Sequence, residues 1–345
     1  MRALALTGVG GLEHLQLLDL PEPAPPGPDE VRVAIRSAAL NRLDLFVAEG
    51  LPGPGLVYPH IAGSDGAGVV DAVGDGVRHV RPGDRVMLNP GIPCGRCDAC
   101  ARGEHSLCDR FAILGEHRGG TIAEYVVLPA ANVAGVPERM SWAEAAAFPL
   151  ATLTGWRMLT TRARVAAGET VLVWGAGGGV AQAAIQVARH LGAAVIATSG
   201  SDAKLEVARR LGAAHLINHA TQDVVAEVKR ITARRGAEVV VDSVGERTWA
   251  ASLRCLARAG RLVTCGATSG PHVALDVRKL FWHQWTILGS TMGTRREFAE
   301  IVALAEAGKL RPVVDRVVPL AEAVSAFQRL ARGEQAGKLV IEVSS

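Results

Sequence analysis

The chain contains 345 residues, 49% of them hydrophobic and 21% charged, with a formal net charge of +3. This length predicts two domains, and the composition is typical of a globular protein. The small net charge argues against nucleic acid or an anionic membrane as a partner. The N-terminus carries no signal-peptide pattern and no apolar run reaches the roughly 18 residues of a membrane span, so we expect a cytoplasmic protein.

The first part of the chain, up to about residue 90, is rich in short β segments. Runs of apolar and β-branched residues predict strands at 30–40 and 66–74, the segment 80–88 indicates a turn leading into a strand, and a further strand is expected within 120–133. From Ser141 the pattern changes. Ser141 and Glu144 form a capping-box pair and predict the start of an alanine-rich helical segment at 141–159.

Apolar strands then alternate with amphipathic helices. Strands are predicted at 169–176, 194–198, 238–245 and 261–268, with helices at 181–193, 201–213 and 247–260. This alternation is typical of a parallel sheet with helices on both faces. A helix at 295–310, strands at 313–320 and 337–343 and a helix between those strands predict a C-terminal return. The fold class is therefore α/β, with a β-rich domain and a doubly wound domain.

Four of the six cysteines lie within fifteen positions, spaced C-x2-C-x2-C-x7-C. In a reducing cytoplasm, clustered thiols are more often metal ligands than disulfides. Four thiolates close a tetrahedral zinc site with no open position, which makes the site structural. An iron–sulfur cluster is the alternative, but the last spacing is too long and no proline follows it. We predict one structural zinc ion on Cys94, Cys97, Cys100 and Cys108.

A glycine-rich turn joins the strand at 169–176 to the helix after it. Small residues at Gly175, Gly178 and Gly179 let a pyrophosphate approach the backbone, and the helix N-terminus offers unpaired N–H groups. Val180 stands where the strict G-x-G-x-x-G motif has its last glycine. The strand before the turn and the helix after it favour a dinucleotide site over the alternative, a tight structural turn.

The residues after the strand at 194–198 indicate which dinucleotide binds. An NAD site has an acidic residue there that binds the ribose hydroxyls, whereas this chain has Ser199, Ser201 and Lys204. Small hydroxyls and a cation leave room and charge for a 2′-phosphate, so NADP(H) is predicted. The alternative is that Asp202 serves NAD one turn later.

The order of these segments resembles the zinc-containing medium-chain dehydrogenase/reductases. The resemblance covers essentially the whole chain and rests on the cysteine loop, "GTIAEYVVLPA", "AAAFPLATLTGW", "VVVDSVG" and "TILGSTMG". The turn "GAGGGVAQAAIQ" is similar to that of the quinone oxidoreductase branch. The resemblance implies a GroES-like β-barrel catalytic domain at 1–150 with a structural zinc lobe at 93–109. It also implies an NADP-binding Rossmann domain at 151–290 and a return of 291–345 to the first domain.

Zinc alcohol dehydrogenases of this superfamily carry a second, catalytic zinc ion on Cys, His and Cys. This chain has Asn41, Ser64 and Leu150 at those places; Asp65 replaces the neighbouring Glu, and Asp44 is kept. An amide, a hydroxyl and an alkyl group cannot hold zinc tightly. We therefore expect a metal-free site with Asn41, Asp44, Ser64 and Asp65 as candidate catalytic side chains. The alternative is a weakly bound hard cation on Asp44 and Asp65.

The resemblance further implies residues around the substrate and the nicotinamide. The substrate-lining residues are Asn89, His117 and Ile122, with His117, Tyr58 and His60 as candidate proton donors. The residues expected at the nicotinamide are Thr154, Val263, Gly266, Ser290, Thr291 and Met292.

The expected absence of a catalytic zinc ion limits which substrates the enzyme can use. Hydride transfer from NADPH without a metal suits an acceptor that is already electron-poor, so we predict a reductase of quinones or of activated enone or enoyl acceptors. The alternatives are an alcohol dehydrogenase-type carbonyl oxidoreductase and a non-catalytic NADP-binding protein. The apolar strand in "WTILGSTMG" resembles a family strand that pairs across a two-fold axis, which implies a homodimer or homotetramer.

Overall fold

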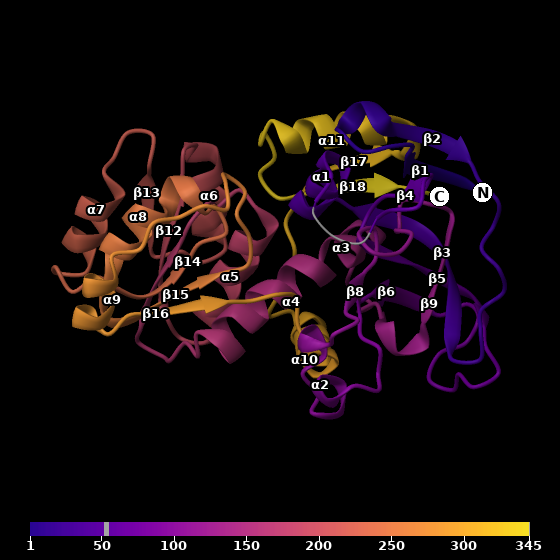
Figure 1. The fold of residues 1–345 in the computed structure, drawn as a ribbon, viewed down its shortest axis with the longest axis horizontal. Helices are drawn as coiled ribbons and strands as arrows, with labels where there is room; N and C mark the ends of the chain where they lie inside the picture. Colours follow the sequence, from indigo (N-terminus) through magenta and orange to yellow (C-terminus); the bar gives the residue numbers. More distant parts are fainter. Residues whose placement is uncertain (52–54, 345) are drawn as a thin grey trace. The chain divides into compact units, whose positions relative to one another are not determined.

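The computed structural model describes residues 1–51 and 55–344. The chain divides into two compact units, Met1–Ala151 with Gly293–Ser345, and Thr152–Met292. Figure 1 shows β-strands in the first unit and strands layered with helices in the second. Among the described residues, no helix combines the length and the apolar character needed to cross a bilayer.

Strand β3 (Glu30–Ala39) is the central strand of the first unit, with alternate residues buried. One of its edges pairs with β5 (Asp65–Val73), and the other pairs first with β9 (Tyr125–Pro129) and then with β18 (Lys338–Glu342). Beyond these lie β6 (Arg85–Leu88) and β10 (Val133–Gly135) on one side and β17 (Val314–Pro319) on the other. The C-terminal strands therefore belong to the same sheet as the N-terminal ones.

The remaining elements of the first unit surround this sheet. Its short strands are β1 (Arg2–Leu6), β2 (Leu15–Asp19), β4 (His60–Ile61), β7 (Gly91–Ile92) and β8 (Ala112–Ile113). Its helices are α1 (Arg42–Glu49), α2 (Asp98–Ala101), α3 (Trp142–Ala147), α10 (Arg295–Glu306) and α11 (Ala323–Ala331). A single apolar core contains Leu4 from the N-terminus together with Phe327 and Ile341 from the C-terminus. Burial of this shared core holds the two ends of the chain in one unit.

The second unit is a parallel sheet in the order β13-β12-β11-β14-β15-β16. Its strands are β11 (Thr170–Val173), β12 (Ala194–Ser199), β13 (His215–Asn218), β14 (Ala237–Val241), β15 (Leu256–Thr264) and β16 (Thr286–Gly289). Its helices are α5 (Gly179–His190), α6 (Asp202–Arg210), α7 (Val224–Ile231), α8 (Glu246–Cys255) and α9 (Val277–His283). Helices α7 and α8 share an apolar core with one face of the sheet, and α5 and α6 contact β11–β13 without joining that core. The predicted doubly wound α/β domain is confirmed.

Several boundaries differ from the sequence-based expectation. The helix expected at 247–260 ends at Cys255, because Leu256 pairs with Ala237 and begins β15. The segment 141–159 forms two helices, α3 and α4 (Pro149–Arg157), which meet at a proline that has no N–H to donate. The predicted capping box at Ser141 is confirmed, with the Ser141 side chain accepting from the N–H of Glu144. Strand β13 and helices α7 and α9 were not predicted, since they are short and partly polar.

Candidate active site

A buried polar cluster in the first unit is organised around Asp65, the first residue of β5. One carboxylate oxygen of Asp65 accepts a hydrogen bond from the backbone N–H of Leu150 at 2.8 Å. The other accepts from Nδ2 of Asn41 and from Nζ of Lys338, each at 2.9 Å. Asp65 has no exposed surface, and Asn41 and Lys338 are 8% and 4% exposed. The fold therefore gathers residues from four distant segments around one carboxylate.

Asn41 and Asp44 belong to this cluster because β3 ends where α1 begins. The carboxylate of Asp44 accepts from the backbone N–H of Asn41 at 2.6 Å, which closes the first turn of α1. Its other oxygen lies 3.5 Å from Oγ of Ser64, a long contact. Burial raises the pKa of Asp44 to about 7, while the Asn41 N–H and the charge of Lys338 act against that increase. Asp44 therefore exchanges its proton near neutral pH.

Lys338 is the residue of the cluster that the sequence did not predict. It opens β18, and the antiparallel register that pairs Val340 with Ala39 continues through a hydrogen bond from Leu40 N–H to the Leu339 carbonyl. This register sets Lys338 beside Asn41, whose Oδ1 accepts from the ammonium. The sequence contained only a weak indication of a role for Lys338, namely a single charged residue at the start of an apolar strand. Its partners are 297 and 273 positions away, and only the strand pairing joins them.

The residues at the places of a catalytic zinc do not fit a metal. Asn41 and Leu150 both hydrogen-bond Asp65, and Ser64 adjoins Asp65 in the chain, so the three places lie together. However, the alkyl side chain of Leu150 has no ligand atom, and both the ammonium and the Asn41 amide already engage the same oxygen of Asp65. Neutral oxygen donors and hydrogen-bond donors do not form a zinc site.

The expected substrate-lining residues fall into two groups. Ile122 is fully buried and packs against the backbone of Gly63, where φ is +94° and a Cβ would collide with the Ile122 side chain. It therefore lies beside Ser64. Asn89 and His117 instead accept hydrogen bonds from nearby backbone N–H groups, of Gly91 and Ile113. Among the described residues, no hydrogen bond or ion pair joins either side chain to the Asp65 cluster.

The other two candidate proton donors, His60 and Tyr58, form no hydrogen bond with the Asp65 cluster among the described residues. Buried His60 donates from Nε2 to the carbonyl of Gly115 at 3.0 Å, and burial lowers the pKa of its ring. Tyr58 is 37% exposed. His60 thus links β4 to the turn at Gly115.

The turn between β11 and α5 in the second unit has the shape that a pyrophosphate requires. Gly175 has φ +71°, a conformation that side chains rarely adopt, and Gly178 precedes the helix without a side-chain cap. The first N–H groups of α5, at Gly179, Val180 and Ala181, therefore remain for an anion. This backbone fits the phosphates of a dinucleotide.

The carboxyl end of β12 provides the surface expected for the adenosine. Oγ of Ser199 accepts from the N–H of Ser201, and Lys204 lies in the first turn of α6. One carboxylate oxygen of the exposed Asp202 accepts from Nδ2 of Asn218 at 2.7 Å.

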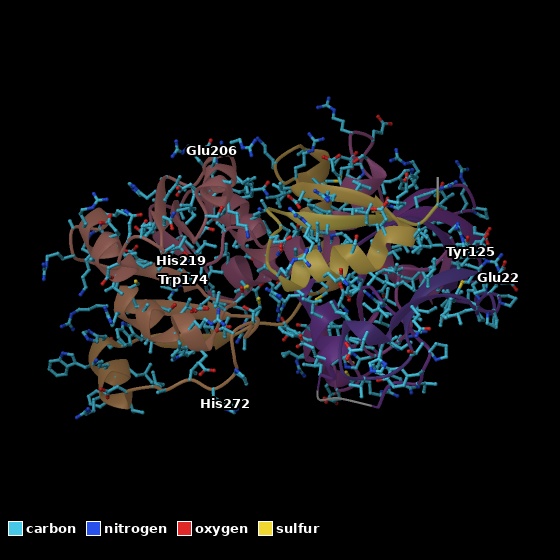
Figure 2. The ribbon with its side chains drawn as sticks, turned by 90° about the horizontal axis from the view of Figure 1, so that it is seen from above. Glu22, Tyr125, Trp174, Glu206, His219 and His272 are labelled. Atoms are coloured by element: carbon cyan, nitrogen blue, oxygen red, sulfur yellow. The ribbon has the colours of Figure 1, made fainter. Side chains whose placement is uncertain are left out.

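A histidine that was not predicted also borders this end of β12. His219 lies beside Trp174, with ring centroids 6.1 Å apart (Figure 2). An added Cβ at Gly200 would lie 3.1 Å from its Nε2. His219 is therefore next to the residues expected to decide between NAD and NADP.

The residues expected at the nicotinamide lie at the ends of β15 and β16 and in α4. Oγ1 of Thr154 lies 3.9 Å from the sulfur of Met292, and both residues are 5% exposed. The N–H of Ser290 donates to the carbonyl of Thr264, while its buried Oγ has no hydrogen-bond partner among the described residues. An orphaned buried hydroxyl suits a polar ligand group such as a carboxamide. Val263, Gly266 and Thr291 lie at or next to these strand ends.

The four cysteines of the 93–109 lobe come together as predicted. All four Sγ atoms lie within 4.8 Å of one another, and none forms a disulfide. Sγ of Cys100 is 3.5 Å from that of Cys97 and 4.0 Å from that of Cys94. These separations bracket the spacing of about 3.8 Å in a tetrahedral site with Zn–S bonds of ~2.3 Å. Cys108 accepts backbone N–H groups, as a thiolate does. The cluster fits a structural zinc ion.

Comparisons with known proteins agree with this geometry. Residues 27–138 match the family described as alcohol dehydrogenase GroES-like domain, and residues 179–307 match zinc-binding dehydrogenase. An NAD-dependent alcohol dehydrogenase of Sulfurisphaera tokodaii and a quinone oxidoreductase of Pseudomonas aeruginosa are each 33% identical over 350 residues, covering 99% of both chains. A crystal structure of an NAD-dependent alcohol dehydrogenase is 47% identical, with a TM-score of 0.96 and full coverage of both chains. The chain therefore belongs to the zinc-containing medium-chain dehydrogenase/reductases and is an oxidoreductase that uses a nicotinamide cofactor.

Proposed function

We propose that this oxidoreductase reduces quinones or activated enones with NADPH and without a catalytic metal. The observation that supports it is the Asp65 cluster, where Asn41, Ser64 and Leu150 stand at the zinc-ligand places and offer an amide, a hydroxyl and an alkyl group. A simple alcohol needs a Lewis acid to stabilise its alkoxide, and losing several kcal/mol of such stabilisation costs orders of magnitude in rate. A quinone or enone spreads the incoming charge over a conjugated oxygen, so hydrogen-bond donors suffice.

The reaction requires one proton for each hydride. Bound NADPH would supply the hydride, and quinone, NADPH and one proton give hydroquinone and NADP⁺. We propose that Asp44 supplies the proton through Ser64, because a carboxyl with a pKa of about 7 is well matched to neutral pH. The 3.5 Å separation of their oxygens would have to shorten when substrate binds, as catalytic hydrogen bonds commonly do.

The second candidate is a carbonyl or alcohol oxidoreductase that uses NAD(H). It is favoured by the names of relatives, since the 33% identical archaeal protein and the 47% identical structure are both called NAD-dependent alcohol dehydrogenases. The quinone oxidoreductase at the same 33% identity favours the first candidate. Because the side chains at the zinc-ligand places do not form a zinc site, we favour the first candidate, the metal-free reduction of quinones or enones.

NADP(H) is proposed as the cofactor on the basis of the β12 terminus. Ser199 places a hydroxyl where a carboxylate would repel a 2′-phosphate, and one carboxylate oxygen of Asp202 is turned to Asn218. Lys204 brings a cationic side chain to the first turn of α6, and His219 lies beside Gly200 with a ring whose pKa is lowered by burial.

We also propose that two chains assemble through β16. This strand ends the parallel sheet, so its outer edge has no partner strand among the described residues. Helix α9, which precedes β16, exposes Val277, Phe281 and Trp282 at 62%, 65% and 66%. A homodimer, or a dimer of dimers, would cover the edge and the apolar side chains together.

An acceptor screen tests the proposed reaction. Purified protein is given NADPH or NADH with a panel of quinones and enones, and separately NADP⁺ or NAD⁺ with primary and secondary alcohols, each with and without a chelator. We expect NADPH oxidation by quinones or enones that the chelator does not affect. Brisk alcohol oxidation without turnover of quinones or enones would establish the second candidate instead.

A further inference from the structure

The lobe that carries the four cysteines is joined to helix α10 by one histidine side chain. Nδ1 of His105, in the single helical turn His105–Leu107 of the lobe, accepts the backbone N–H of Arg295 at 3.3 Å. Figure 1 shows α2 of the lobe beside α10. Arg295 is the first residue of α10, and an N–H at that place has no acceptor within its own helix. The lobe therefore satisfies a helix N-terminus that is 190 positions away in the chain.

The ring of His105 is suited to accept this hydrogen bond. Burial and the charge of Arg295 lower the pKa of His105, although the charges of Glu104 and Glu297 act against that decrease. The ring is therefore neutral at pH 7, and a neutral imidazole has one nitrogen that accepts. Because Nδ1 faces the N–H of Arg295, the proton of the neutral ring belongs on Nε2.

The segment 290–293, which is expected at the nicotinamide, leads directly into α10. Its first residue is held by a hydrogen bond of 2.8 Å from the N–H of Ser290 to the carbonyl of Thr264. Within the segment Met292 has φ +46°, a left-handed conformation that a residue with a side chain keeps only where its surroundings enforce it. The other end of the segment is fixed by the start of α10, and the bond from the lobe is part of that end.

We propose that His105 is a positioning residue for the nicotinamide: by holding the start of α10 it fixes the segment 290–293, so the zinc lobe serves cofactor binding as well as stability. The inference rests on the nicotinamide position used in the proposed function. Without the acceptor, the half-buried N–H of Arg295 would lose its partner, and Met292 would be free to leave its left-handed conformation. The nicotinamide would then meet a segment that no longer keeps one conformation.

The test removes each partner of the hydrogen bond in turn. His105→Leu removes the acceptor, whereas His105→Asn keeps an oxygen at the place of Nδ1. Arg295→Pro removes the donor at a helical position that tolerates proline, whereas Arg295→Ala keeps the N–H and removes only the side chain. Leu107→Ala is a matched control in the same turn of the lobe, because Leu107 is 62% exposed.

Each variant is titrated with two ligands that differ only in the nicotinamide. One is the dinucleotide that the wild type binds more tightly, and the other is the same molecule without its nicotinamide, which is 2′-phospho-ADP-ribose for NADP(H) and ADP-ribose for NAD(H). Calorimetry gives both dissociation constants, and elemental analysis gives the zinc content of every variant.

We expect His105→Leu and Arg295→Pro to raise the dissociation constant of the dinucleotide about 5-fold, and to change that of the nicotinamide-free ligand less than about 2-fold. His105→Asn, Arg295→Ala and Leu107→Ala should bind both ligands as the wild type does. Rescue by the asparagine would show that the acceptor atom, rather than the imidazole as such, is what the segment requires.

Unchanged dinucleotide affinity in both His105→Leu and Arg295→Pro would overturn the proposal. An equal loss for the nicotinamide-free ligand would overturn it too, because a general loosening of the fold has that effect. If His105→Leu fails to fold or loses zinc, the two Arg295 variants decide, since they leave the lobe unaltered. A wild-type preference for NAD(H) would contradict the proposed cofactor and leave this test intact, because each dinucleotide has its own nicotinamide-free counterpart.

Discussion

Asp44→Asn is the substitution whose effect the structure fixes most closely. The asparagine keeps an oxygen to accept the N–H of Asn41, so the first turn of α1 stays closed. It removes the ionisable group whose pKa burial raises from 3.8 to about 7. A carboxyl with a higher pKa in the folded chain binds more protons there than in the unfolded chain. The free energy of unfolding of the wild type therefore falls as pH rises from about 4 to about 7, and is level above that.

The size of this effect follows from the shift. At ~1.36 kcal/mol per pKa unit, burying the ionised Asp44 costs about 4 kcal/mol above pH 7, and about half of that at pH 5.5. The variant avoids this cost at every pH. We therefore expect its stability advantage over the wild type to grow by about 2 kcal/mol between pH 5.5 and 8.5.

Urea unfolding of both proteins at four pH values across this range measures the difference. Glu144→Gln is a matched control, because Glu144 occupies the same third helical position in the capping box of α3. Burial raises the pKa of Glu144, but the hydrogen bonds from Arg311 and Ser141 outweigh it and lower that pKa overall. The ionised Glu144 therefore stabilises the fold above its unfolded pKa, and this contribution is lost only at lower pH. The difference in the free energy of unfolding between Glu144→Gln and the wild type should accordingly be the same at all four pH values. An Asp44→Asn advantage that is independent of pH, or that shrinks as pH rises, would refute the assignment of a raised pKa.

Three further predictions concern the lobe, the cofactor and assembly. Cys97→Ser should bind less zinc than the one ion per chain expected of the wild type, and its melting temperature should fall by about 5 °C or more, while kcat of the folded fraction changes less. Elemental analysis and calorimetry measure these effects. Two zinc ions per chain in the wild type would contradict the prediction. Ser199→Asp should raise the dissociation constant of NADPH by ~10-fold or more and lower that of NADH, because a carboxylate repels the 2′-phosphate and binds ribose hydroxyls. Fluorescence titration measures both constants. Equal affinities of the wild type for NADPH and NADH would count against NADP(H) as the cofactor. Light scattering should give two or four chains of 36.1 kDa, and Phe281→Arg with Trp282→Arg should shift the mass to a single chain; a wild-type monomer at micromolar concentration would disprove assembly through β16.

Local patterns in the sequence were enough for the features that depend on neighbouring residues. The spacing of Cys94, Cys97, Cys100 and Cys108 predicted a cluster, because four thiols within fifteen positions can converge with little help from the rest of the fold. The alternation of apolar strands and amphipathic helices predicted the parallel sheet, because the hydrophobic periodicity of each element is also a local pattern. Where local preference and pairing disagreed, as at Leu256, the strand partner prevailed over helix propensity.

The chemistry of the polar cluster required the tertiary structure. The sequence identified Asn41, Ser64 and Leu150 as poor metal ligands, but it could not show what compensates the charge of Asp65. Lys338 reaches Asp65 only because β18 pairs with β3 across almost the whole length of the chain. The raised pKa of Asp44 likewise comes from burial, which no local pattern encodes. Sequence alone determined which donors are present, and only the folded chain decided which of them share a site, because contact between distant segments is set by packing and strand register.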